Sequence, residues 1–116
     1  MIEFSLNANT DEWKANEEEC KFVEDKGFTA LFENLFVGLI KNKYPEGVPS
    51  ENIKTVHRIF KKLDETTQPN IQVESSEIDF LEDIFVTSKL PIPPNIIRLY
   101  MIYKTEVQRC VSKITT

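Results

Sequence analysis

The sequence predicts a mainly α fold: a compact bundle of four to five helices with a small two-stranded β element, at the margin of the α+β class. Apolar residues recur every three or four positions over several long stretches, which is the spacing of a buried helix face. Two short segments alternate apolar and polar residues instead, as a half-buried strand does. The length of 116 residues suits a single domain over residues 1–116, able to bury a core without disulfides or metal.

The two strands are expected at residues 1–6 and 71–74. In the first, Ile2, Phe4 and Leu6 fall on one side of the chain. An isolated short strand cannot satisfy its backbone hydrogen-bonding groups. We therefore expect the two segments to pair with each other.

The first half of the chain predicts two helices separated by Gly27. An acidic, weakly amphipathic helix is expected over residues 10–25, and a central helix over residues 28–43. The second is apolar on nearly every side, which places it in the middle of the bundle. Its large residues recur every four positions: Phe28, Phe32, Phe36 and Ile40.

Two further helices are expected at residues 50–64 and 76–89. Ser50 is a suitable N-cap for the first, and Ser76 with Asp79 resembles a capping box that opens the second. The buried face predicted for the helix at 50–64 consists of Ile53, Val56, Phe60 and Leu63.

The last helix is expected at residues 95–112, after a Pro-rich extended link at 91–94. Pro93 and Pro94 stand just before it, where missing N–H groups cost little. Its predicted core stripe consists of Ile96, Tyr100, Tyr103, Val107, Cys110 and Ile114.

Composition and charge narrow the class of protein. With 41% hydrophobic and 28% charged residues the chain is globular rather than disordered. It shows neither a signal peptide nor an apolar run of about 20 residues, so no membrane contact is expected. Two cysteines far apart in sequence, Cys20 and Cys110, favour a reducing compartment, and hence a cytoplasmic protein.

The net charge of −5 is unevenly distributed. Residues 1–25 carry eight acidic and two basic side chains, whereas residues 89–116 carry one acidic and five basic ones. The two ends of the chain therefore either attract each other within the fold or face different partners.

Catalytic and metal-binding motifs are absent from the sequence, so we predict no enzyme, no cofactor, no metal and no catalytic residue. A cryptic enzyme remains conceivable if His57, the sole histidine, activates the thiol of Cys20 or Cys110. Asp79 and Asp83 share a helical face that could in principle hold a hard cation, but a solvated surface explains them as well.

A basic stripe on the helix at 50–64 offers a second hypothesis, nucleic-acid binding. Its residues could contact phosphates, although the whole chain is acidic and the stripe lacks interleaved aromatic residues. Neutralisation of the acidic N-terminal segment is the competing interpretation. An acidic mimic of nucleic acid is a further alternative. The stripe consists of Lys54, Arg58, Lys61 and Lys62.

The strongest functional indication is an apolar surface on the last helix. Ile97, Met101 and Ile102 fall outside its core stripe, close to Arg98. Either neighbouring segments wrap around them or they contact another chain. We therefore predict a non-enzymatic protein–protein interaction module, a small accessory protein such as an inhibitor, adaptor or assembly factor. Its partner would be another protein, or a second copy in a homodimer.

Overall fold

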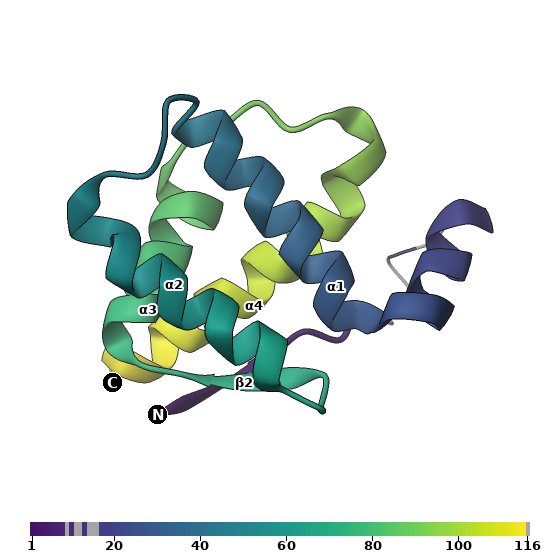
Figure 1. Ribbon diagram of the computed structural model, residues 1–116, viewed down its shortest axis with the longest axis horizontal. Helices are drawn as coiled ribbons and strands as arrows, with labels where there is room; N and C mark the ends of the chain where they lie inside the picture. Colours follow the sequence, from purple (N-terminus) through teal and green to yellow (C-terminus); the bar gives the residue numbers. More distant parts are fainter. Residues whose placement is uncertain (9, 11–12, 14–16, 116) are drawn as a thin grey trace.

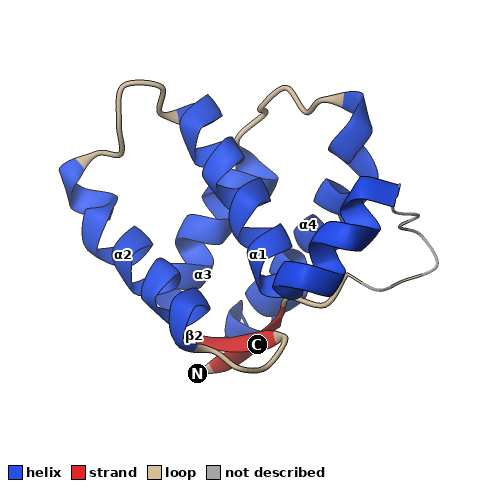
Figure 2. Cartoon of the chain, turned by 45° about the vertical axis from the view of Figure 1, so that its right-hand side comes forward, coloured by secondary structure: helices blue, strands red, loops and turns tan. Residues whose placement is uncertain are grey.

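The computed structural model describes residues 1–8, 10, 13 and 17–115, and its fold is the predicted helical bundle with a small two-stranded sheet (Figure 1). The strands lie at the base of the molecule and the helices stand above them (Figure 2). The elements in chain order are β1 (Ile2–Ser5), α1 (Glu17–Lys43), α2 (Ser50–Glu65), β2 (Asn70–Val73), α3 (Ser75–Glu82) with a π-helical turn η1 (Asp83–Thr87), and a 3-10 turn η2 (Pro94–Ile96) that leads into α4 (Ile97–Thr115).

The strands β1 and β2 form the expected antiparallel pair. Phe4 lies opposite Ile71 in the register of the ladder. Both side chains are buried, as is Val73, while the alternate residues of β2 face outward. The alternation of apolar and polar residues therefore identified both the strands and the face that packs on the helices.

A kink at Gly27 divides α1 into two parts. Gly27 has φ 85° and ψ 172°, a conformation that side-chain-bearing residues avoid. The prediction of two helices meeting at this residue is confirmed, but the expected start at residue 10 is wrong, because Thr10 lies in a bend. The helix begins at Glu17, where three successive acidic residues suit the positive end of the helix dipole. Residues 11–12 and 14–16 of the predicted helix lie outside the described residues.

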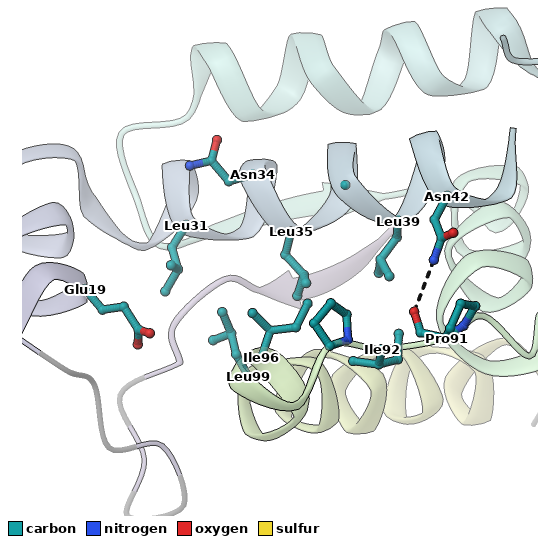
Figure 3. Close-up of a pocket in the computed structure, with 12 residues that line it drawn as sticks. Glu19, Leu31, Asn34, Leu35, Leu39, Asn42, Pro91, Ile92, Ile96 and Leu99 are labelled. Atoms are coloured by element: carbon teal, nitrogen blue, oxygen red, sulfur yellow. Dashed lines mark hydrogen bonds between the residues drawn. The ribbon is translucent and has the colours of Figure 1, made fainter. Parts of the chain in front are cut away.

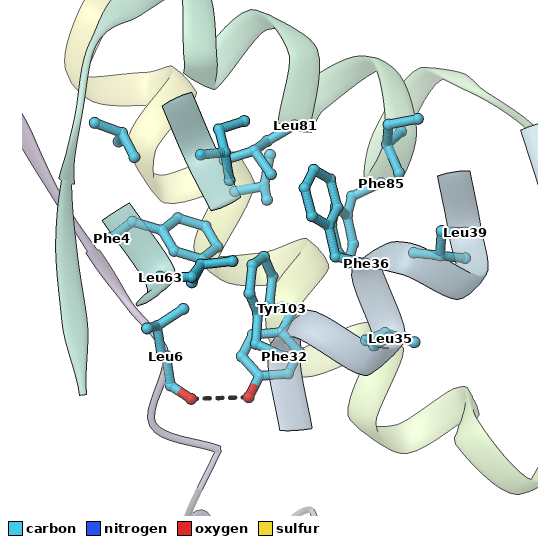
Figure 4. Packing of buried hydrophobic residues seen from close by; sticks show 14 of the residues in the cluster. Phe4, Leu6, Phe32, Leu35, Phe36, Leu39, Leu63, Leu81, Phe85 and Tyr103 are labelled. Atoms are coloured by element: carbon cyan, nitrogen blue, oxygen red, sulfur yellow. Dashed lines mark hydrogen bonds between the residues drawn. The ribbon is translucent and has the colours of Figure 1, made fainter. Parts of the chain in front are cut away.

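Phe32, on the second part of α1, is at the centre of the core. It is fully buried, in agreement with the central position predicted for this helix. The buried hydroxyl of Tyr103 donates a hydrogen bond of 2.8 Å to the carbonyl of Leu6, and burial raises the pKa of Tyr103 well above its usual range (Figure 4). The distances between the centroid of the Phe32 ring and those of its aromatic neighbours are 4.9 Å for Tyr103, 5.3 Å for Phe4, 5.6 Å for Phe36 and 6.0 Å for Phe85.

The buried face of α2 differs from the predicted one. Val56 and Leu63 are buried as expected and Phe60 is half-buried, but Ile53 is 53% exposed. Ile59, absent from the prediction, is completely buried. The buried face is rotated toward Ile59, which leaves Ile53 at its edge in the first turn.

The start and end of α3 also correct the prediction. The capping box is formed by Glu74 and Glu77, not by Ser76 and Asp79, because the buried Glu77 carboxylate accepts a hydrogen bond from the Glu74 amide at 3.1 Å. The α-helix ends at Glu82, and the turn η1 replaces the predicted helical continuation to residue 89.

Candidate interaction surface

The helix α4 buries one face against the core and leaves the opposite face of its first turns exposed. Half of its predicted stripe is buried, namely Tyr103, Val107 and Cys110, whereas Ile96, Tyr100 and Ile114 are only half-buried. Leu99, which the prediction omitted, belongs to the buried set. The buried residues of the helix are Leu99, Tyr103, Val107 and Cys110.

Three of the four predicted contact residues lie on the exposed side of α4. Ile97 is 45% exposed and Met101 is 46% exposed, one helical turn apart. Arg98 is exposed beside them. We call Ile97 and Met101 the α4 ridge. These side chains occupy a regular helix anchored by its buried face, so they are held in place without a partner.

Ile102, the fourth predicted residue, is placed differently. It is half-buried, packs against the edge of the core and lines a small cavity together with Ser5 and Tyr103. It therefore faces the N-terminal segment rather than the ridge. A polar residue at this position would disturb internal packing, so Ile102 is a poor choice for testing an external contact.

An apolar groove runs between the second part of α1 and the Pro-rich link to α4 (Figure 3). Its volume is about 710 Å³, within the usual range of ligand and peptide sites. Leucines at a spacing of four residues form its floor on α1, and residues of the link and of α4 form the opposite wall. These residues are Leu31, Leu35 and Leu39 on one side and Pro91, Ile92, Pro93, Ile96 and Leu99 on the other. We call this feature the α1–α4 groove.

The rim of the groove on α1 is polar or small. Asn34, Gly38 and Asn42 form a second row with a spacing of four residues, and all three are exposed. The side-chain amide of Asn42 donates a hydrogen bond of 3.1 Å to the carbonyl of Pro91 and so fixes one end of the link. A Cβ atom built on Gly38 would meet no heavy atom within 4 Å. Gly38 therefore leaves open space through which another backbone or side chain could approach.

Charges of opposite sign lie on the groove and the ridge. Glu19 lines the groove, and the exposed Glu17 and Glu18 precede it in the same helix. Arg98 adjoins the ridge and Lys104 lies two turns further along α4. Among the described residues these two bases form no ion pair, so the predicted attraction between the acidic and basic ends does not involve them.

Contacts with α3 engage two members of the predicted basic stripe on α2, Arg58 and Lys62. Lys54, Arg58 and Lys61 are exposed, and Arg58 donates to the hydroxyl of Ser76 at 3.2 Å. Lys62 lies 2.5 Å from the fully buried carboxylate of Glu77. The ion-pair partner of Lys62 is thus on α3, and none of the ion pairs among the described residues joins the stripe to the acidic N-terminal segment.

The candidate catalytic residues differ in their exposure to solvent. His57 is exposed on α2, and Cys20 is exposed on the first part of α1. Cys110 is buried against β1, with its sulfur 3.6 Å from the carbonyl of Glu3. Burial, reinforced by the nearby Glu106, raises the pKa of the Cys110 thiol to about 11, so it is protonated at neutral pH. Within the described residues, no group of three or more His, Cys, Asp or Glu side chains is placed to hold a metal ion.

Comparison with known protein families, with characterised proteins and with solved structures found no match to this chain. In the part of the chain that the structure describes, none of the helices has the length and apolar character needed to span a membrane. The case for a function therefore depends on the surface itself.

Sequence reasoning missed the groove and two ion pairs. The row of leucines on α1 was visible as a helical pattern, but the pattern does not say what lies opposite them. Gly38 between two asparagines was the local signal, since a small residue within an apolar helix often marks a close approach. The pairs of Lys62 with Glu77 and of Lys43 with Asp83 join residues distant in sequence, which no local pattern reveals.

Proposed function

We propose that the protein is a non-enzymatic protein–protein interaction module, acting as an inhibitor, adaptor or assembly factor. The observation that carries this proposal is the α4 ridge, with Ile97 and Met101 each close to half exposed on a rigid helix whose first turns also line the α1–α4 groove. Exposed apolar side chains that adjoin one another, as Ile97 and Met101 do, are typical of surfaces that bind other proteins, whereas a single exposed apolar residue such as Ile53 is common on any protein.

The α4 ridge supplies part of the free energy that a specific contact requires. Full burial of a large apolar side chain contributes about 1.5–3 kcal/mol, so the exposed halves of two residues contribute roughly 2 kcal/mol together. Residues that pack into the groove of about 710 Å³ would add to this. The neighbouring Arg98 would give orientation and speed of association more than affinity.

Affinity capture with matched variants tests the proposal. The wild-type protein is expected to retain a protein that Ile97→Gln/Met101→Gln loses, while Ile53→Gln retains it. Ile53 is the control because it is 53% exposed but lies on α2. Circular dichroism must show native helix content in each variant. Equal capture by all three proteins would contradict the assignment of the surface, and capture of nothing, with no self-association either, would contradict the function.

The exposure of three basic residues on α2 keeps nucleic-acid binding as a second candidate. Lys54, Arg58 and Lys61 lie three or four residues apart and all reach solvent. If they bind phosphates, a mobility shift with DNA or RNA should weaken with salt and disappear in Lys54→Glu/Lys61→Glu. The same double charge reversal at the exposed Lys26 and Lys41 is the control. A shift that survives the α2 reversal would exclude this stripe.

A cytoplasmic location is part of the same proposal. Cys20 and Cys110 are free thiols, one exposed and one buried, so no disulfide joins them. This fits a reducing compartment. Alkylation of intact cells, followed by mass measurement, should find both thiols reduced; an oxidised Cys20 in most molecules would contradict the location.

A further inference from the structure

We infer that the α1–α4 groove receives the α4 ridge of a second copy of this chain, an inference that rests on the interaction function proposed above. An apolar groove by itself does not show what binds in it. Here, however, the same molecule carries a complementary surface. The ridge and the groove match in spacing, in chemistry and in charge.

The spacing of the two surfaces suits helix packing. Asn34, Gly38 and Asn42 form an exposed row with a period of four residues along α1, above the buried leucines of the groove floor, and Ile97 and Met101 have the same period along α4. Helices commonly pack by placing a row of this period on one helix beside the same kind of row on the other. The close approach that this requires is possible at Gly38, where a Cβ atom would meet only open space.

The charges around the two surfaces are complementary. The groove includes Glu19, next to the exposed Glu18, while Glu17 forms an exposed ion pair of 3.7 Å with Lys21 in the same helix. The ridge is flanked by Arg98, which has no ion-pair partner among the described residues. A second copy therefore brings a basic, apolar helix to an acidic, apolar groove, which favours this orientation over the reverse.

The contact joins two different surfaces, so it is heterologous. Each copy offers one ridge and one groove. Such contacts build closed rings or open chains. The structure thus assigns self-association that depends on protein concentration.

Sedimentation velocity on the pure protein, over a range of concentrations, tests the inference. The average mass should rise above the 13.5 kDa of the monomer as concentration increases. Ile97→Gln/Met101→Gln should raise the dissociation constant about tenfold or more, as loss of central apolar contacts does. Ile53→Gln should leave it unchanged. A wild-type protein that stays at the monomer mass at all concentrations would overturn the inference.

A groove-blocking variant provides the second arm. Gly38→Leu should fold, because its side chain enters open space and leucine favours helix over glycine. It should also remove self-association, whereas Gly38→Ala should retain most of it. An equimolar mixture of Gly38→Leu with the ridge variant should restore one contact per pair, since each supplies the surface that the other lacks. Failure of that mixture to associate would overturn the inference.

Charge reversal at the two surfaces is a third test of self-association. Arg98→Glu should weaken association, and combining it with Glu18→Lys/Glu19→Lys should recover part of it. If the pure protein is monomeric but capture of another protein depends on Ile97 and Met101, the interaction function stands and self-docking fails. If neither is found, the interaction function itself fails.

Discussion

Glu77 is a fully buried carboxylate whose position depends on two contacts. Its Oε1 atom lies 2.5 Å from the ammonium of Lys62 and accepts the amide of Glu74. Its Oε2 atom is buried without a hydrogen-bond partner among the described residues. A buried charge is tolerated only when it is paired, so the stability of this corner of α2 and α3 depends strongly on Lys62.

We predict that Lys62→Met lowers the free energy of unfolding by about 2–3 kcal/mol, because it leaves the Glu77 charge buried without its counter-ion. Lys61→Met, at an exposed neighbouring position, should change it by less than about 0.5 kcal/mol. The double variant Lys62→Met/Glu77→Met should recover most of the loss. Urea unfolding measures all three, and equal losses for the two lysine variants would show that the pair contributes little.

The two cysteines should differ in their response to pH. Cys20 is exposed, whereas burial and then Glu106 raise the pKa of Cys110 from 9.0 to about 11. At pH 8 a maleimide should modify Cys20 first and Cys110 only on opening of the fold, as mass spectrometry can show. The folded state holds the Cys110 proton more tightly than the unfolded state, so this residue's contribution to stability is present below pH 9 and is lost as the pH rises toward 11. Rapid double labelling of the native protein at pH 8 would contradict its burial.

Among the elements, α1 contains two glycines with opposite roles. Gly27 has a positive φ of 85° at the kink, whereas Gly38 lies within regular helix. In neither case does a Cβ atom meet a neighbour within 4 Å. The difference between them is therefore one of backbone conformation alone.

We predict that Gly27→Ala destabilises the protein by about 1–2 kcal/mol, since its conformation is strained for any side-chain-bearing residue. Gly38→Ala should stabilise it by about 0.5–1 kcal/mol, through the better helix propensity of alanine. Thermal unfolding should thus shift in opposite directions in the two variants. A stabilised Gly27→Ala would mean that α1 is straight in solution.

Local sequence patterns predicted which helices and strands form better than they predicted where each one begins and ends. Alternation and helical spacing located both strands and the central helix, because burial against a common core imposes those periods. The start of α1, the capping box at Glu74 and the turn η1 were missed. The capping box and η1 involve contacts from elsewhere in the chain, those of Lys62 with Glu77 and of Lys43 with Asp83. Ile53 shows the same limit, since its helical period fits the core although no element covers it.

At the scale of the whole molecule, β1 and α4 hold the two ends of the sequence together. The backbone amide of Ser5 donates to the carboxylate of Glu106, and Arg109 donates to the carbonyl of Glu3. The hydroxyl of Tyr103 also donates a hydrogen bond to the carbonyl of Leu6, the residue that follows β1. The ends of the chain accordingly lie near each other in Figure 1.

We predict that Phe4→Ala costs about 3–4 kcal/mol in free energy of unfolding, because Phe4 is completely buried against Phe32. Glu3→Ala, an exposed neighbour in the same strand, should cost less than about 0.5 kcal/mol. Chemical denaturation followed by tryptophan fluorescence and circular dichroism would measure both. A small effect of Phe4→Ala would mean that β1 is dispensable to the core.

The candidate surface could be predicted only in part. Helical geometry singled out Ile97 and Met101, and both are exposed. It could not place Ile102, which the N-terminal segment partly covers, nor the groove, which exists only because the Pro-rich link crosses α1. A surface formed by one helix can be predicted from the spacing of its apolar residues. A surface formed between two segments depends on how the whole chain folds.

The seam between β1 and α4 also sets the order of events during synthesis. Until α4 has left the ribosome, β1 and its continuation lack their contacts with Tyr103 and Arg109, and the aromatic cluster around Phe32 lacks Tyr103. A nascent chain ending near residue 96 would therefore expose that cluster to the cell. Completion of the core therefore has to await α4, whatever structure the earlier segments have already formed.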